Sequence, residues 1–239
     1  MASRLRTLCH IVRQGLHDCF NLYVPRYCPV CNHPLNTTEQ YLCGGCLVTL
    51  PYSRERDFYD NYAARLFMGK IPIERVHGHL LYGEEKLSRL IINKLKYHHR
   101  PDLAVAMGRM MALAVQPQGF FDGVDCIVPV PLHWIRKLKR GYNQSEKLAE
   151  GVAEVTGLPI FRHHVVRMRN NPTQTHKTKQ ERIANTQNLF QARKTFTAHH
   201  ILLIDDVMTT GSTLTSCAHA ILQISPDIRI SILTLCKVK

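Results

Sequence analysis

The stretch that most constrains the fold of this chain is residues 201–214, which read ILLIDDVMTTGSTL. Its four branched apolar residues, Ile201 to Ile204, are typical of a buried strand in a parallel sheet. Two adjacent carboxylates follow, Asp205 and Asp206. An apolar pattern at helical spacing starts at Leu214. Between the carboxylates and that pattern lie small hydroxyl residues around one glycine: Thr209, Thr210, Gly211, Ser212 and Thr213.

A strand, an acidic pair, a short loop and a helix, in this order, predict a site for a sugar phosphate. The N–H and hydroxyl groups of the loop can surround a phosphate at the positive end of the helix. The carboxylates can accept hydrogen bonds from vicinal ribose hydroxyls, and open α/β sheets bind ligands at that edge. Each part alone has an ordinary explanation, since an Asp pair is often a solvated turn and TTGST can be a helix cap. A P-loop is excluded, because GxxxxGK[ST] is absent.

Four of the nine cysteines form two pairs, Cys28 with Cys31 and Cys43 with Cys46, separated by eleven residues. Two such knuckles can direct four thiolates at one ion, with Pro29 stiffening the first and two glycines, Gly44 and Gly45, allowing the tight turn of the second. We expect one structural zinc ion there, because four protein ligands leave no open coordination position. Two disulfides and a redox pair are the alternatives.

The chain of 239 residues is long enough for one sizeable domain and a small appendage. We expect an N-terminal amphipathic helix and the zinc-binding module in residues 1–50, a polar and aromatic linker in residues 51–74, and an α/β domain in residues 75–239. Strands alternate with helices in the last range, so the sheet should be mostly parallel, with helices on both faces. Strands are expected at 76–82, 126–130, 201–204 and 228–235 and, less regularly, at 159–166; helices are expected at 84–97, 101–115 and 143–156.

No apolar run approaches the roughly 18 residues that a transmembrane helix needs. Arg4 and Arg6 precede an apolar stretch, but polar residues from Arg13 to Asp18 interrupt it, so it does not read as a signal peptide. A cytoplasmic location is therefore expected.

Basic residues are in excess, with 31 Lys and Arg against 18 Asp and Glu, for a formal net charge of +13. Between positions 133 and 182 lie eleven basic and four acidic residues. This is more positive charge than one pyrophosphate needs and favours a polyanionic partner. Three aromatic residues, Tyr97, Trp134 and Tyr142, lie among the cations of the chain and are candidates for stacking on bases, although ordinary packing also accounts for them.

Three further stretches carry a resemblance to a known family: Ile127 to Pro131 (IVPVP), Arg140 to Gln144 (RGYNQ), and Asn171 to Asn185 with Phe190. Residues 201–214 are similar to the phosphoribosyl pyrophosphate (PRPP) binding signature of type I phosphoribosyltransferases. Together with the cysteine pairs, these stretches resemble the ComF family, the competence-associated phosphoribosyltransferase-like proteins, also called GntX-type DNA-utilisation proteins. The resemblance covers about residues 25–238.

The resemblance implies a type I phosphoribosyltransferase-like fold and roles for particular residues. Asp205 and Asp206 would hold the ribose hydroxyls of PRPP, and the loop of Thr209, Thr210, Gly211, Ser212 and Thr213 would hold the 5′-phosphate. Lys94 and Lys96 match the lysine-bearing end of a helix, and a charged helix terminus is the ordinary alternative. Mg²⁺ is implied, because pyrophosphate carries it. The residues expected to contact pyrophosphate or another phosphate are Pro129, Val130, Pro131, Arg140, Asn143 and Gln144.

The family's role implies a protein that binds PRPP and single-stranded DNA and acts in natural competence or in the use of DNA. Other DNA-uptake proteins at the inner membrane are the implied protein partners. Two other functions stay open: an active phosphoribosyltransferase of nucleotide metabolism with a structural zinc module, and a PRPP sensor without turnover. No stretch identifies the acceptor, so fold and signature do not establish catalysis.

Overall fold

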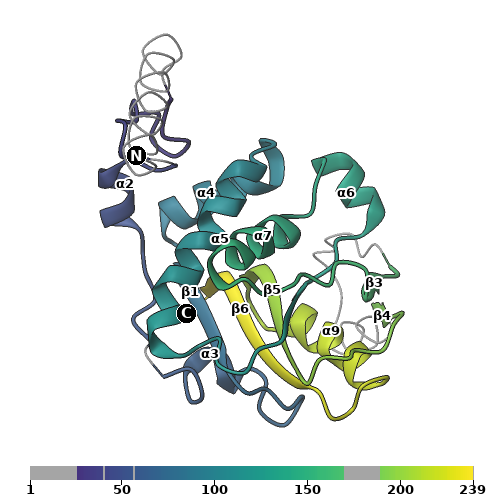
Figure 1. Ribbon diagram of the computed structural model, residues 1–239. Helices are drawn as coiled ribbons and strands as arrows, with labels where there is room; N and C mark the ends of the chain where they lie inside the picture. The colour runs from purple at the N-terminus through teal and green to yellow at the C-terminus, as the bar shows by residue number, and fades with distance from the viewer. Residues whose placement is uncertain (1–25, 40, 56, 170–188, 239) are drawn as a thin grey trace, which may run out of the picture. The chain divides into compact units, whose positions relative to one another are not determined.

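The computed structural model describes residues 26–238 apart from residues 40, 56 and 170–188 (Figure 1). The chain divides into two compact units, Met1–Leu50 and Pro51–Lys239. Two expectations lie outside the described residues: the N-terminal amphipathic helix and the whole stretch from Asn171 to Asn185.

The larger unit is built on a four-stranded sheet in the order β1-β6-β5-β2, with every neighbouring pair parallel. The strands are β1 (Val76–Tyr82), β2 (Cys126–Pro129), β5 (His200–Met208) and β6 (Arg229–Val238). The predicted parallel sheet is thereby confirmed. At the carboxyl end, Ile204 of β5 is in register with Pro129 of β2 and Leu233 of β6, so the loops that follow these strands emerge at one edge.

Helices cover the sheet on both faces, as expected (Figure 1). On one side are α4 (Lys86–Tyr97), α5 (Pro101–Val115) and α7 (Gln144–Thr156), and on the other is α9 (Ser212–Leu222). The branched residues at the start of β5 explain this arrangement. Ile201 and Leu203 pack in one core cluster with Leu214 and Ile221 of α9. Side chains alternate along a strand, so the intervening apolar residues point to the opposite face.

Residues 51–74 are not the expected linker. They contain a short helix, α3 (Tyr62–Arg65), and Phe58, Ala63 and Phe67 are almost completely buried. The Asn61 amide group donates hydrogen bonds to the Asp57 carbonyl (2.7 Å) and the Val76 carbonyl (2.9 Å), which fastens this segment to β1. Phe67 belongs to the core cluster that contains Val76 of β1 and Leu214 of α9, and Phe58 packs edge-on against His77 of β1 and Phe120, whereas Tyr59 is exposed.

The strand expected at 159–166 is mostly absent. Only the end of this range is extended, in β3 (Val165–Arg167), which pairs antiparallel with β4 (Phe190–Ala192). Ile160 makes an isolated parallel bridge to Ile127, so the chain runs beside β2 at this point without forming a further strand of the sheet. The remaining described helices are α2 (Gly44–Thr49), η1 (Gln116–Gln118) and α6 (Trp134–Arg140).

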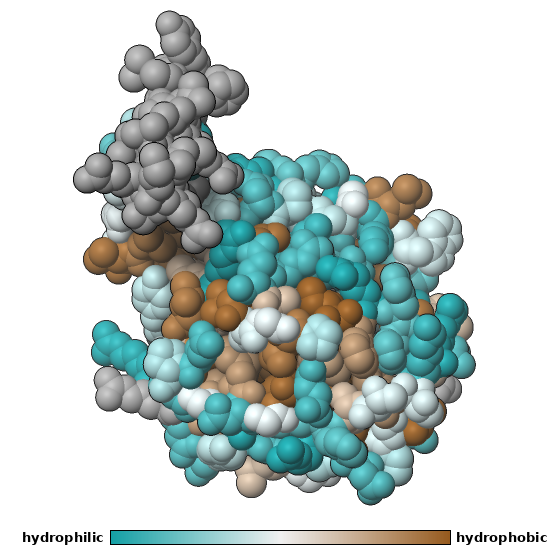
Figure 2. Space-filling view, in the orientation of Figure 1, coloured by the Kyte–Doolittle hydropathy of each residue, from teal (hydrophilic) through white to brown (hydrophobic). Residues whose placement is uncertain are grey.

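Within the described ranges, every helix is too short or too polar to cross a membrane. Figure 2 shows a face of the molecule on which hydrophilic residues predominate around smaller hydrophobic areas.

Candidate functional site

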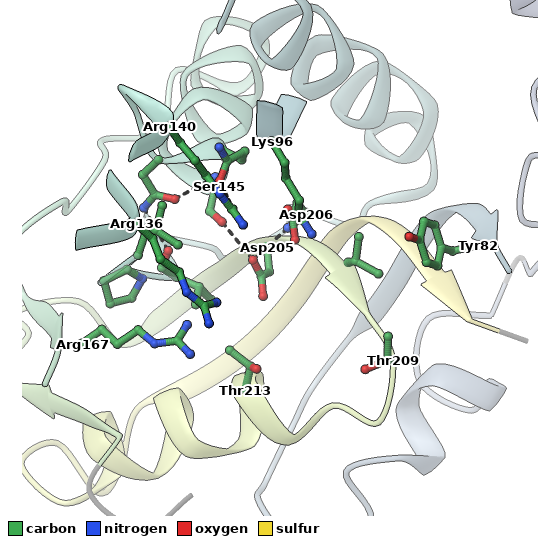
Figure 3. A pocket seen from close by; sticks show the side chains of 16 residues that line it. Tyr82, Lys96, Arg136, Arg140, Ser145, Arg167, Asp205, Asp206, Thr209 and Thr213 are labelled. Atoms are coloured by element: carbon green, nitrogen blue, oxygen red, sulfur yellow. Dashed lines mark hydrogen bonds and ion pairs between the residues drawn. The ribbon is translucent and has the colours of Figure 1, made fainter. Parts of the chain in front are cut away.

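The acidic pair lies at the carboxyl edge of the sheet and lines a cavity of about 300 Å³ (Figure 3). Asp205 and Asp206 belong to β5 itself, which continues to Met208, rather than to a turn after it. This corrects the ordinary explanation of the pair as a solvated turn. Most of the residues expected at the site line the same cavity: Val130, Pro131, Arg140, Asn143, Gln144, Asp205, Asp206, Thr209 and Thr213.

The two carboxylates have different surroundings. Asp205 accepts hydrogen bonds from the Ser145 hydroxyl of α7 and from the N–H of Asp206, both at 2.9 Å. Burial, and then the neighbouring charge of Asp206, raise the pKa of Asp205 to about 7. Asp206 instead forms an ion pair with Lys96 at the end of α4, with Nζ and Oδ2 3.1 Å apart (Figure 3). A ligand hydroxyl that reaches Asp206 therefore meets a carboxylate already partnered by a lysine.

The loop after β5 leads directly into α9. Gly211 is the N-cap of this helix and adopts the left-handed conformation (φ 72°), which favours glycine. No side chain caps the first N–H groups of α9, so they remain available to an anion. A small cleft beside the loop is lined by Thr209, Gly211, Ser212 and Thr213. Thr210 lines neither this cleft nor the larger cavity, and its hydroxyl donates to the Ser212 hydroxyl at 3.1 Å.

On the β2 side, the cavity is bounded by the loop after Pro129. Pro129 is the last residue of β2 and does not line the cavity, whereas Val130 and Pro131 do. The Asn143 side chain accepts from the Ser145 N–H (3.1 Å), which caps α7, and donates to the Val130 carbonyl (3.0 Å). Its amide thus supports the loop, whereas the resemblance implied that it contacts a phosphate.

Gln144 also acts through its neighbours. Its amide group donates to the Leu95 carbonyl (3.1 Å), and its oxygen accepts from the Arg140 guanidinium (2.9 Å). Gln144 is almost fully buried, so its visible effect is to orient Arg140 toward the cavity.

Arg136 of α6 and Arg167 of β3 also reach the cavity (Figure 3). The sequence alone did not assign either arginine to the site. Burial lowers the pKa of both guanidinium groups, and the charge of a neighbouring arginine lowers it further. Like charges in a partly buried site indicate a preference for an anionic ligand. Arg136 lies four residues before Arg140 on the same helix, and residues at this spacing share one helix face, so the sequence could have indicated that Arg136 joins Arg140 at the site. Arg167 is positioned by the antiparallel pairing of β3 with β4, which no local sequence pattern predicted.

The smaller unit brings its four paired cysteines together. The sulfur atoms of Cys28, Cys31, Cys43 and Cys46 all lie within 4.8 Å of one another. Four thiolates at about 2.3 Å around a tetrahedral zinc ion would be about 3.8 Å apart, so the donor set fits. Burial acts to raise the pKa of the Cys28 thiol, but backbone N–H groups that donate to it outweigh this effect and lower the pKa to about 7. The four cysteines are thus positioned to hold a metal ion.

The two knuckles are built differently. Cys28 lies in a tight turn, in which its N–H donates to the His33 carbonyl (2.7 Å) and Asn32 has a positive φ of 62°. Cys43 is the N-cap of α2, and its sulfur accepts from the Cys46 N–H at 3.4 Å. The expected glycine turn at Gly44 and Gly45 is therefore wrong, because both residues form the first turn of a helix, and neither has a positive φ.

Comparisons with known proteins agree with this geometry. The model of the phosphoribosyl transferase domain family matches residues 130–239. The DNA utilization protein YhgH of Salmonella typhi is 32% identical over 137 residues, which are 56% of this chain and 60% of that protein. Competence protein F of Haemophilus influenzae is 27% identical over 202 residues, covering 78% and 86% of the two chains. Competence protein ComFC of Bacillus subtilis is 33% identical over 109 residues, covering 46% and 43%. The match to the Salmonella protein thus spans less than two thirds of that protein's length.

Proposed function

Because the chain belongs to the ComF family of competence-associated phosphoribosyltransferase-like proteins, we propose that its cavity binds Mg²⁺-PRPP and that the protein handles single-stranded DNA in uptake or utilisation. One observation supports the proposed binding of Mg²⁺-PRPP most directly. An acidic pair and four cationic side chains line one cavity, and the uncapped N–H groups at the start of α9 belong to the small cleft that adjoins it at Asp205, Thr209 and Thr213.

The parts of PRPP have complementary partners around this cavity. The ribose hydroxyls donate to the carboxylates of Asp205 and Asp206. The 5′-phosphate accepts from the N–H and hydroxyl groups of the loop between Thr209 and Thr213, at the positive end of α9.

The pyrophosphate lies toward Val130, Pro131 and Arg140. Arg136 and Arg167 add two guanidinium groups that can bind phosphate oxygens bidentately. Mg²⁺ enters with the pyrophosphate, and water completes its coordination.

Calorimetry with Mg²⁺ and PRPP tests this assignment in the variant Asp206→Asn. The amide keeps the size of the side chain but loses the charge that pairs with Lys96 and one acceptor for a ribose hydroxyl. We expect the dissociation constant to rise roughly tenfold or more. Asp60→Asn is the matched control, because Asp60 also pairs with a cation, Arg65, at an exposed surface of the larger unit. If both variants bound PRPP with the affinity of the wild type, the cavity at Asp206 would not be the PRPP site.

The exposed side of α6 is the surface that we propose for single-stranded DNA. Trp134 is 67% exposed, and Lys137 and Lys139 lie in the last turn of the helix. Tyr97 is equally exposed and lies against the Arg140 guanidinium, 5.7 Å from ring centre to carbon. Exposed aromatic rings among cations can stack on bases while the cations contact phosphates. Tyr142 does not belong to this surface, since it is buried and donates to the Leu95 carbonyl.

Salt-dependent binding of a fluorescent single-stranded oligonucleotide tests this surface. The double variant Lys137→Gln/Lys139→Gln should bind more weakly, and the slope of log K against log salt should become shallower by about 0.7 for each lost contact, which is about 1.4 if Lys137 exchanges its ion pair with Glu146 (3.1 Å) for a DNA phosphate. Lys70→Gln/Lys86→Gln is the control, because it removes the same charge from two exposed lysines outside α6. If both double variants lose affinity equally, net charge explains the binding and α6 does not.

We further propose that the metal held by the four cysteines is zinc and that the protein works in the cytoplasm, where thiols stay reduced. Turnover is the alternative function, because the acidic pair and loop also meet the needs of a working phosphoribosyltransferase. Exchange of labelled pyrophosphate into PRPP in the presence of candidate bases tests it. Exchange that depends on one base would favour an enzyme of nucleotide metabolism.

A further inference from the structure

The loop after β5 rests on an aromatic side chain from a distant part of the sequence. A Cβ atom added to Gly211 would lie 3.0 Å from Cε1 and 3.1 Å from Cζ of Phe67, and 3.7 Å from Cβ of Leu66. Phe67 is 1% exposed. The backbone of Gly211 therefore lies against the edge of the Phe67 ring, and even a methyl group at this position would require the ring to move by a few tenths of an ångström.

The ring itself is held firmly. Residues 57–71 are anchored to β1 by two hydrogen bonds, one from the Asn61 amide group to the Val76 carbonyl (2.9 Å) and one from the Val76 N–H to the Phe58 carbonyl (2.9 Å). The Phe67 N–H donates to the Ala64 carbonyl (3.0 Å), and its carbonyl accepts from the N–H groups of Lys70 and Ile71. Phe67 also belongs to the core cluster that contains Leu214 and Ala218 of α9. The ring thus has a fixed position relative to both β1 and α9.

Gly211 is the residue at which the loop turns into α9. Its carbonyl accepts the first helical hydrogen bond, from the Thr215 N–H at 2.8 Å, while no side chain caps the N–H groups that follow. The loop's other described hydrogen bond, from Thr210 to Ser212, joins two exposed residues, so the buried contact at Gly211 comes from Phe67, with the partly buried Leu66 beside it. The direction of the N–H groups at residues 211–213 depends on where that contact places Gly211.

We propose that Phe67 is a positioning residue for the phosphate-binding loop, an inference that rests on the proposed binding of PRPP. The ring does not touch the ligand. It holds the N–H groups of residues 211–213 in the arrangement that the 5′-phosphate requires, so its loss should weaken binding of the phosphoribosyl end and leave the pyrophosphate end unaffected.

Calorimetry of the full chain with two separate probes, ribose 5-phosphate and Mg²⁺-pyrophosphate, tests this inference. Phe67→Leu retains an apolar side chain but removes the ring edge that contacts Gly211. We expect its dissociation constant for ribose 5-phosphate to rise about five- to tenfold and that for pyrophosphate to stay within about twofold of the wild type. Phe67→Ala should show a larger change in the same direction if it folds.

Phe58→Leu is the matched control. Phe58 is equally aromatic, 5% exposed and in the same segment, but its ring packs edge-on against Phe120 (4.8 Å) and His77 (5.6 Å). This control should bind both probes normally. Equal losses in both leucine variants, or a normal affinity of Phe67→Leu for ribose 5-phosphate, would overturn the inference.

Amide hydrogen exchange of the ligand-free protein gives a second readout. Exchange at residues 211–213 should be faster in Phe67→Leu than in the wild type or Phe58→Leu by on the order of tenfold, because the loop opens locally. Unchanged exchange would contradict the positioning role even if the wild type bound no ligand. A wild type that binds neither probe would instead refute the proposed function, and the exchange result would then decide the inference alone.

Discussion

At the scale of single residues, the protonation of Asp205 is the most informative property of the cavity. Burial and the charge of Asp206 raise its pKa to about 7, whereas an unfolded Asp titrates near about 4. Between these values the folded protein binds more protons than the unfolded chain, so this group makes the folded state less stable as pH rises from about 4 to about 7. Buried His77 and His79 have the opposite effect, since burial lowers the pKa of both imidazoles to about 3 and about 4.

Asp205→Asn isolates the contribution of the carboxyl group, because both histidines are present in either protein. We expect the free energy of unfolding of the variant to rise relative to the wild type between pH 5 and pH 7, by at most about 1.4 kcal/mol per pH unit. Urea denaturation at several pH values measures this difference. A difference that does not vary with pH would mean that Asp205 titrates normally in the folded protein.

At the scale of elements, the start of α7 depends on one amide group. Asn143→Ala removes both the cap on the Ser145 N–H and the hydrogen bond to the buried Val130 carbonyl, and we expect a loss of about 2 kcal/mol in the free energy of unfolding. Asn143→Ser keeps a capping oxygen and should lose about half as much. Urea denaturation of both variants checks this order. Equal losses would show that the cap contributes nothing.

The four-cysteine module allows a second prediction at this scale. Purified protein should contain about one zinc ion per chain, and Cys46→Ser should lose it, because three thiolates bind the ion far less tightly than four. Metal analysis provides the measurement. Cys126→Ala is the control, since Cys126 is buried in β2 and lies outside the group. Zinc-free wild-type protein with a normally folded module would contradict the assignment.

At the scale of the whole molecule, α6 connects the two proposed binding functions. Arg136 and Arg140 line the cavity, while Lys139 and Trp134 are exposed on the same short helix. Mg²⁺-PRPP carries a net negative charge, so its binding would neutralise cations on the same helix as the proposed DNA surface. Binding at the two sites should then be antagonistic.

We therefore expect saturating Mg²⁺-PRPP to weaken the binding of single-stranded DNA by about three- to tenfold at low salt, and less at higher salt, where charges are screened. Fluorescence anisotropy with and without PRPP measures the effect. By linkage, DNA must weaken PRPP binding by the same factor. Enhanced DNA binding in the presence of PRPP would contradict the electrostatic coupling.

Much of this molecule follows from local sequence patterns. Ile201 to Ile204 predict a buried parallel strand because branched apolar residues without polar alternation must be covered on both faces. The acidic pair, the hydroxyl-rich loop and the helix after it are neighbours in sequence, so their order alone places them at one edge of the sheet. The pairing of the four cysteines is equally local, since each knuckle spans only four residues.

Contacts between distant residues required the tertiary structure. Arg167 reaches the cavity from β3, which pairs antiparallel with β4, Lys96 reaches Asp206 from the end of α4, and Phe67 contacts Gly211 from a segment that looked like a linker. These contacts join residues that are far apart in the sequence. The periodicity of apolar residues indicates which face of a helix or strand is buried, but it does not indicate which other element that face packs against. Local chemistry alone therefore assigned to the site the residues adjacent along β5 and α9, and the family resemblance added Val130, Pro131, Arg140, Asn143 and Gln144. Only the packing of distant segments revealed that Arg136 and Arg167 join them and that Phe67 lies under the loop.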